Sequence, residues 1–106
     1  MEILEKEVPL RVDENGAVRV GDTRVLFELV IRSYLRGHTP EEIVRQYTTL
    51  TLADTYGAIA YFLEHREQVE EYLQDREDGA RRVRDTLEEA GVAVDVHTQQ
   101  ARQESS

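Results

Sequence analysis

The polar side chains best suited to contact a nucleic acid stand close together in the chain: Arg45, Thr49, Thr51 and Thr55. An arginine neutralises a phosphate, and hydroxyl groups or free backbone amides at the start of a helix suit phosphate oxygens and base edges. We therefore expect these residues to form any DNA-binding site. Thr51 also has a purely structural interpretation, as a helix cap that contributes on the order of 1 kcal/mol.

Residues for catalysis or metal binding form no such group. His38, His65 and His97 are far apart and share no helix-face spacing with carboxylates, and the chain has no cysteine. A phosphate-binding glycine loop, a nucleophile elbow and a zinc-binding helix motif are absent from the sequence. We predict a protein that is not an enzyme, has no catalytic residues, and needs neither a metal nor a cofactor.

Two closely spaced helix starts must position the candidate DNA-binding residues. Thr39 caps the first helix, Pro40 takes its first position, and Glu42 completes a capping box. Thr51 starts the second helix, with Asp54 placed to favour its positive end. The short turn between the two helices indicates a helix-turn-helix from residue 39 to residue 63.

The helix after Thr51 has apolar residues on more than one side. One set has core spacing: Leu52, Tyr56, Ile59, Ala60 and Leu63. The other side is small and flat, and we expect it to pack closely against another element: Asp54, Gly57, Ala58 and Tyr61. A free recognition helix normally carries Arg, Lys, Asn or Gln for base edges, and this helix has none of them between Thr51 and Leu63.

The segments before the helix-turn-helix predict a β-hairpin and a first helix. Val8, Leu10 and Val12 alternate with polar residues, Asn15-Gly16 is a hairpin turn signal, and the alternation resumes at Val18. The helix runs from about Leu26 to Gly37. The predicted fold is mainly α, with a short N-terminal β-hairpin arm (1–25), a homeodomain-like three-helix core (26–64), a C-terminal helical extension (65–91) and a flexible tail (92–106).

The C-terminal extension carries apolar patterns that its own sequence cannot bury. We expect Asp78-Gly79 to weaken or interrupt a helix, after which a narrow apolar stripe runs from Ala80 to Ala90. Alternating valines then indicate a short strand. Such patterns are typical of a segment that binds a partner as a helix in a groove and an added strand. The candidate partner-binding residues are Arg82, Val83, Leu87, Val92, Val94 and Val96.

Charge and composition narrow the class of protein. The 106 residues carry a net charge of −9 with a pI near 4.8, which is the wrong sign for a dedicated nucleic-acid binder. Four arginines oppose only three glutamates between positions 24 and 45, so DNA contacts would come from the N-terminal two thirds. Without a signal sequence or a long apolar run, we expect a cytoplasmic protein that does not enter a membrane.

Several ordered motifs between residues 8 and 74 resemble the bacterial domain-of-unknown-function family 433. They are Pro9-Leu10-Arg11-Val12-Asp13, Asn15-Gly16, Val18-Arg19-Val20-Gly21, Thr23-Arg24-Val25, Gly37, Thr39-Pro40-Glu41-Glu42-Ile43, Tyr47, Leu50-Thr51-Leu52-Ala53-Asp54 and Ala58-Ile59-Ala60-Tyr61. The resemblance implies an antitoxin-like protein, often encoded beside a PIN-like nuclease toxin. Its helical core would bind operator DNA to repress its own operon, and its C-terminal region would wrap the toxin.

The sequence departs from that pattern at the implied DNA face. Because the last core helix has no Arg or Lys, attraction to the DNA backbone would fall to arginines elsewhere: Arg11, Arg19, Arg24, Arg32, Arg36 and Arg45. The alternative is a protein-interaction or structural module that does not bind DNA. In either case the small hairpin has open edges that a second chain could cover, so we predict a homodimer.

Overall fold

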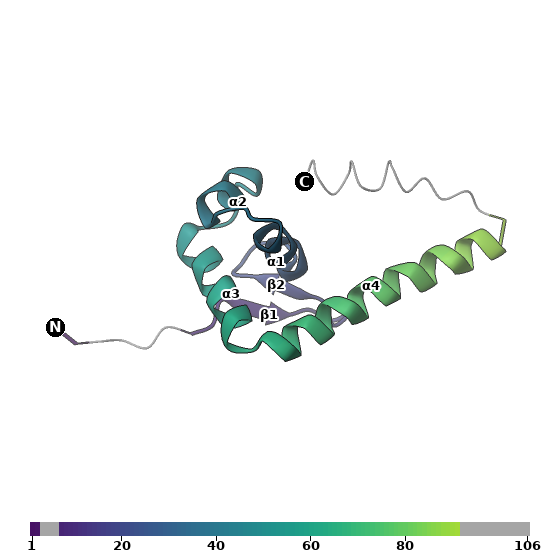
Figure 1. Ribbon diagram of the computed structural model, residues 1–106, viewed down its shortest axis with the longest axis horizontal. Coiled ribbons are helices and arrows are strands. Elements are labelled where there is room, and N and C mark those ends of the chain that lie inside the picture. The colour runs from purple at the N-terminus through teal and green to yellow at the C-terminus, as the bar shows by residue number, and fades with distance from the viewer. Residues whose placement is uncertain (3–6, 92–106) are drawn as a thin grey trace. The chain divides into compact units, whose positions relative to one another are not determined.

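The computed structural model describes residues 1–2 and 7–91 of the chain, in two units of which the first is Met1–Arg66 and the second begins at Glu67. The elements in the described residues are β1 (Leu10–Val12), β2 (Val18–Val20), α1 (Phe27–Leu35), α2 (Pro40–Gln46), α3 (Leu52–Glu64) and α4 (Arg66–Glu89). A mainly helical fold behind a short N-terminal hairpin is therefore confirmed (Figure 1).

The N-terminal hairpin forms where the sequence predicts it. β1 and β2 are antiparallel in the register Leu10↔Val20, Arg11↔Arg19 and Val12↔Val18. The Asp13 carboxylate accepts the backbone N–H groups of Asn15 and Ala17, and Gly16 closes the turn with a φ of 82°. Only glycine adopts such an angle without steric cost, which explains the Asn15-Gly16 signal.

Both predicted helix caps of the helix-turn-helix are present. The Thr39 hydroxyl accepts the N–H of Glu42, and the Glu42 carboxylate accepts the N–H of Thr39, which completes the capping box. The Thr51 hydroxyl accepts the N–H of Asp54 at the start of α3. These bonds satisfy amides that a helix leaves without internal partners, so they determine where α2 and α3 begin.

The core of the first unit lies between the hairpin and the first three helices. Its largest fully buried apolar side chains come from β2, α1, α2 and α3: Val20, Val30, Ile31, Ile43 and Phe62. Phe62 meets the ring of Tyr34 edge to face, with 6.3 Å between ring centroids. β2 contacts both α1 and α3, so the hairpin is held against the helical core (Figure 1).

The side of α3 predicted to face the core is mostly exposed. Leu52, Tyr56 and Leu63 are 42%, 49% and 50% exposed, and Ala60 is also exposed, whereas Ile59 is buried as predicted. The buried side consists of Thr55, Ala58, Ile59 and Phe62. The prediction was wrong because apolar residues occur on both sides of this helix. Periodicity alone cannot choose between two such sides.

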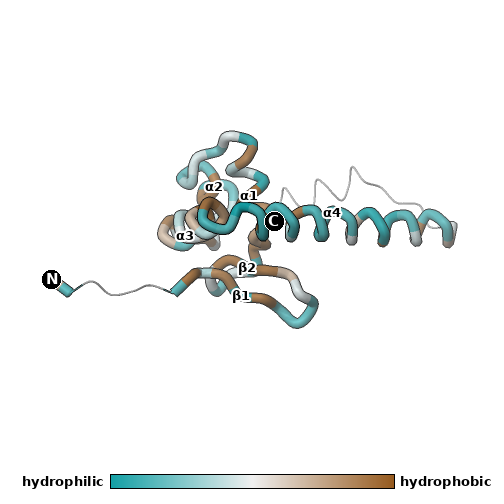
Figure 2. The backbone as a smooth tube through the Cα atoms, turned by 60° about the horizontal axis from the view of Figure 1, so that its bottom comes forward, coloured by the Kyte–Doolittle hydropathy of each residue, from teal (hydrophilic) through white to brown (hydrophobic). Residues whose placement is uncertain are grey.

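The predicted interruption at Asp78-Gly79 is also wrong, because α4 continues through it to Glu89. One glycine costs a helix only about 1 kcal/mol relative to alanine. The Arg81 guanidinium lies 3.7 Å from the carboxylates of Glu77 and Asp78, so these two ion pairs span the glycine. The Gln74 amide donates to Asp78 in the turn before it. Figure 2 shows that α4 is hydrophilic along most of its length.

Within the described ranges, no helix is both long enough and apolar enough to cross a membrane.

Candidate partner-binding and nucleic-acid-binding surfaces

The four candidate DNA-binding residues separate into exposed and buried positions. Arg45 in the last turn of α2, Thr49 in the turn, and Thr51 at the start of α3 are exposed. Thr55 is completely buried, and its hydroxyl donates to the Thr51 carbonyl at 2.9 Å. Thr55 therefore belongs to the core and cannot contact DNA in this fold, which corrects the sequence prediction. The sequence did contain a signal for this burial: Thr55 shares one side of the helix with Ala58, Ile59 and Phe62. Phe62 is the largest purely apolar side chain of α3 and favours burial of that side.

Negative charge gathers where α2 begins. The hydrogen bond that the Tyr56 hydroxyl donates to Glu41, at 2.7 Å, lowers the pKa of the Glu41 carboxyl below its usual value. Hydrogen bonds from the Thr39 backbone amide and hydroxyl likewise lower the pKa of Glu42. Both carboxylates stay ionised near neutral pH. They stabilise the start of the helix but repel a phosphate that approaches this end.

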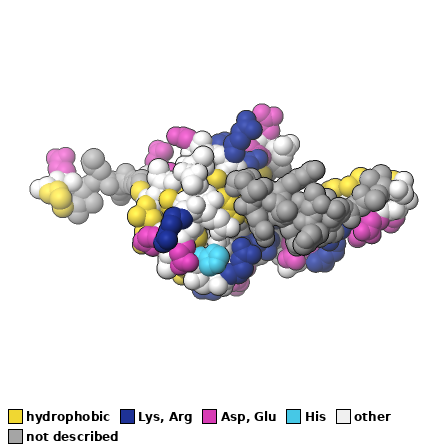
Figure 3. All heavy atoms as spheres, turned by 90° about the horizontal axis from the view of Figure 1, so that it is seen from above, with side chains coloured by type: hydrophobic (Ala, Val, Ile, Leu, Met, Phe, Trp, Pro, Cys, Tyr) yellow, Lys and Arg dark blue, Asp and Glu magenta, His cyan; other side chains and the backbone are white. Residues whose placement is uncertain are grey.

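The exposed side of α3 forms an apolar surface, hereafter the α3 face, made of Leu52, Ala53, Tyr56, Ala60 and Leu63. These positions share one side of the helix, where successive turns repeat every 3.6 residues. Figure 3 shows one side of the whole molecule, on which hydrophobic side chains are exposed among charged groups of both signs. Because the α3 face carries no cation, it cannot provide the arginine or lysine contacts that most base recognition uses.

A half-open hollow of about 280 Å³ lies along one edge of the α3 face. Its lining residues are Glu7, Val8, Pro9, Ala53, Gly57, Ala60, Tyr61, Glu64 and His65. A Cβ atom on Gly57 would lie 2.7 Å from Cγ of Pro9, so only a glycine permits this approach of the N-terminal arm to α3. The close packing predicted for Gly57 is confirmed, although its neighbour is a proline.

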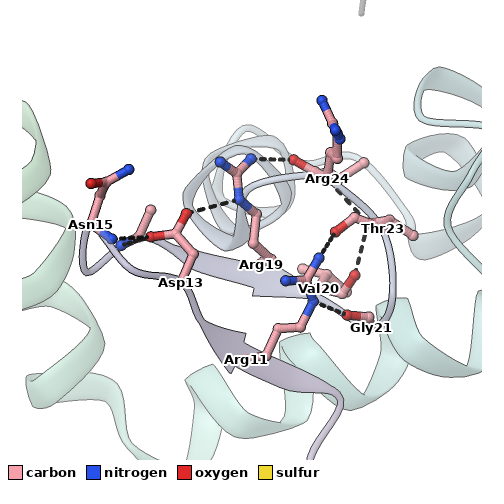
Figure 4. Close-up of polar contacts among 10 residues, drawn as sticks. Arg11, Asp13, Asn15, Arg19, Val20, Gly21, Thr23 and Arg24 are labelled. Atoms are coloured by element: carbon pink, nitrogen blue, oxygen red, sulfur yellow. Dashed lines mark hydrogen bonds and ion pairs between the residues drawn. The ribbon is translucent and has the colours of Figure 1, made fainter.

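The two hairpin arginines form hydrogen bonds with the hairpin turn and with the loop that follows β2 (Figure 4). Arg11 donates to the carbonyls of Gly21 and Thr23, at 3.0 and 2.8 Å, while Arg19 donates to the Arg24 carbonyl and to Asp13. Burial acts to raise the pKa of the Asp13 carboxyl, but backbone hydrogen bonds and Arg19 outweigh it and hold that pKa low. Arg11 and Arg19 thus have structural roles, whereas the Arg24 guanidinium points away from the network.

The described histidines have structural surroundings. His38 Nδ1 lies 2.8 Å from the hydroxyl of Ser33, a fully buried polar side chain. The His65 ring lies against Tyr61, with 4.4 Å between centroids. Among residues 1–2 and 7–91, no three metal-ligating side chains lie close enough together to hold an ion.

The candidate partner-binding residues of α4 share a surface. Val83 is 61% exposed, and with Arg82, Thr86 and Leu87 it lines a shallow, mostly apolar hollow of about 240 Å³. Arg81, beside them, is already paired with Glu77 and Asp78. The other candidates, Val92, Val94 and Val96, lie outside the described residues.

Comparison with known proteins gives one match. Residues 14–62 match a family described as protein of unknown function (DUF433). The matched segment runs from the hairpin turn into the last turn of α3 and supports the resemblance that the motifs indicate. It covers less than half of the 106 residues and leaves α4 outside. No curated protein and no solved structure matches the chain.

Proposed function

We propose that this chain is an antitoxin-like regulatory protein that acts by binding a partner protein, and that the α3 face is a principal contact surface. The observation that carries the proposal is the exposure of Leu52, Tyr56 and Leu63 on one uncharged side of α3. In a helix-turn-helix that reads DNA, this helix would present polar and basic groups to the major groove. An apolar surface there suits a protein instead.

The composition of this surface agrees with that of known protein interfaces. Interface centres are depleted in charge and enriched in aromatic residues, and they are surrounded by a polar rim. Tyr56 supplies an aromatic ring near the middle of the α3 face, and its hydroxyl is already satisfied by Glu41 at the edge. The family resemblance adds the class of partner, a PIN-like nuclease toxin that the protein would neutralise.

Operator binding is a second candidate, favoured by one observation. Arg45, Thr49 and Thr51 are all exposed around the turn of the helix-turn-helix. Phosphate contacts by this group would be weakened by Glu41 and Glu42, so repression would need low salt, a dimer or a bound partner. Affinity for the protein's own promoter fragment should then fall steeply as salt rises, because phosphate contacts release counterions. Absence of binding at low salt, with and without partner, would leave protein interaction alone.

The test of partner binding uses the product of the adjacent gene and a pair of matched variants. Leu63→Asp places a charge in the α3 face, and Val12→Asp places one on the hairpin at a residue that is 69% exposed. We expect Leu63→Asp to weaken binding by roughly tenfold or more, in the range of an interface hot spot. Val12→Asp should bind as the parent does in calorimetry. Equal affinities for Leu63→Asp and the parent would refute the proposed contact.

A further inference from the structure

The α3 face and the hollow beside it form one continuous surface. Ala53 and Ala60 belong to both, and Gly57 lies at the base of the hollow, against Pro9. Because residues 53, 57 and 60 are alanine or glycine, the surface is recessed at these positions. Larger apolar side chains around them, those of Val8, Leu52, Tyr56 and Leu63, are between 42% and 51% exposed. A partner that covers the α3 face can therefore insert one side chain into the hollow.

The charges around this surface are mainly negative. Glu7 and Glu64 line the hollow, and neither carboxylate has a hydrogen bond or ion pair within the part of the chain that the structure describes. Glu41 lies at the opposite edge, beside Tyr56. Among the described residues, the positively charged or chargeable groups nearest this surface are Arg45, which interacts with Glu41, and His65, which lines the hollow. Arg66 follows His65 in the chain, and its guanidinium lies over the Phe62 ring. Carboxylates remain in excess.

This charge distribution distinguishes between two molecules that could cover the α3 face, a second copy of the chain and a basic partner protein. A second copy of the same surface would bring like charges together across a twofold axis, because each copy would present the same carboxylates to the other. A partner with basic groups around an apolar centre would meet opposite charges instead. An arginine or lysine also matches the hollow itself, since its aliphatic stem covers an apolar floor while its charged head reaches a carboxylate.

We propose that the α3 face binds an amphipathic helix of the partner protein that has basic flanks, and that one arginine or lysine of this helix enters the hollow between Pro9 and α3 and pairs with Glu64 and Glu7. This inference rests on the proposed function, namely that the α3 face binds a protein, and adds the chemistry of the segment bound. In this binding mode, the apolar face of an amphipathic helix lies against a complementary apolar surface.

The first experiment titrates the full-length protein with two synthetic helical peptides while its backbone amide NMR signals are followed. Both peptides have ~15 residues, about four helical turns, and the same apolar residues, but one has Arg and Lys at its polar positions and the other has Glu. We expect the basic peptide to shift signals of α3 and the arm around Pro9. If the acidic peptide shifts them equally, or if neither peptide does, the inference is wrong.

Because the net charge of −9 attracts any basic peptide, a matched pair of variants is needed. Glu64→Gln removes a carboxylate from the hollow, while Glu71→Gln removes an exposed one from α4. Glu64→Gln should lower the affinity for the basic peptide by roughly fivefold, as expected for loss of a partly exposed ion pair. Glu71→Gln should have little effect on that affinity. Ala60→Leu, which fills the hollow at an exposed position, should also weaken binding. Equal affinities for Glu64→Gln and Glu71→Gln would refute the ion pair.

Two further measurements separate this inference from the proposed function. If Leu63→Asp abolishes binding to the product of the adjacent gene but Glu64→Gln and Ala60→Leu do not, the α3 face binds its partner without a basic side chain in the hollow. The proposed function then stands and the inference fails. If Leu63→Asp has no effect on that binding, both fail. If Leu63→Asp instead converts a dimer into a monomer in light scattering, the occupant is a second copy and the inference is overturned.

Discussion

Two threonines one helical turn apart show how local position decides the role of a side chain. Thr51 lies before the first turn of α3, is exposed, and accepts the N–H of Asp54. Thr55 faces the core, and its hydroxyl bonds back to the Thr51 carbonyl. The same hydroxyl chemistry therefore serves as a cap at one position and as a satisfied buried group at the next. Of these two, only Thr51 remains accessible to a ligand.

Arg45 is the residue whose replacement most directly tests DNA binding. We expect Arg45→Ala to weaken binding to the protein's own promoter fragment, because it removes an exposed cation of the helix-turn-helix. Its melting temperature should stay within a few degrees of the parent, since exposed side chains contribute little to stability. Arg84→Ala on α4 makes the same change in net charge and is the control in mobility-shift titrations. Parental affinity in Arg45→Ala would remove this residue from the site.

Glu42 makes stability depend on pH. Hydrogen bonds from Thr39 hold the pKa of Glu42 below its usual 4.5, so ionised Glu42 favours the folded state at higher pH. That contribution is present above pH 4.5 and is lost as the pH falls through the lowered pKa. Glu42→Gln keeps an accepting oxygen but lacks the charge. Its deficit in unfolding free energy should therefore shrink as urea titrations are repeated from pH 7 down to about 3. A deficit constant across this range would contradict the assignment.

At the scale of elements, α3 and α4 follow different rules. α3 is apolar on two sides, and the side that packs against α1, α2 and β2 is the one that is buried. α4 is long and charged, and its continuity through Gly79 comes from helix-forming neighbours and side-chain pairs. The apolar side of α3 that remains exposed is the one that forms the proposed partner contact. Packing of the core thus creates the candidate site.

The two helical glycines should respond in opposite ways to replacement by alanine. A Cβ at residue 57 would lie 2.7 and 2.9 Å from ring carbons of Pro9, so Gly57→Ala must displace the arm or α3 and should lower the melting temperature. A Cβ at residue 79 meets nothing within 4 Å. Gly79→Ala should stabilise α4 by up to about 1 kcal/mol, seen as slower amide hydrogen exchange along that helix. Unchanged stability in Gly57→Ala would contradict the tight arm contact.

At the scale of the whole molecule, acidic residues are concentrated towards the C-terminal end of the chain. Between Glu64 and Glu89 the chain has ten acidic residues and five basic ones, whereas positions 24–45 carry a small basic excess. The matched family segment ends inside the first unit. We therefore expect any DNA contact to come from the first unit, and the second unit to add affinity for an individual partner.

A chain ending at Asp78 tests this division. It keeps the buried residues Val69 and Leu73 and loses the exposed surface around Val83. We expect it to retain the folded core by circular dichroism and the homodimer by light scattering, because the hairpin edges remain available for pairing. Affinity for the partner should fall in calorimetry. A shortened chain that binds as tightly as the parent, or that does not fold, would show that the segment after Asp78 is not a separate partner-binding part.

What the sequence determined by itself was local. The Asn15-Gly16 turn, the Thr39–Glu42 capping box and the Thr51 cap involve bonds between residues at most four positions apart, and all were predicted correctly. Tertiary structure alone decided that Thr55 is buried while Tyr56 is exposed, and that Gly57 meets Pro9. Such choices depend on which distant elements pack against each side of a helix. Burial of Phe62, Ile31 and Val20 in one core stabilises one side over the other, and no local pattern contains that comparison.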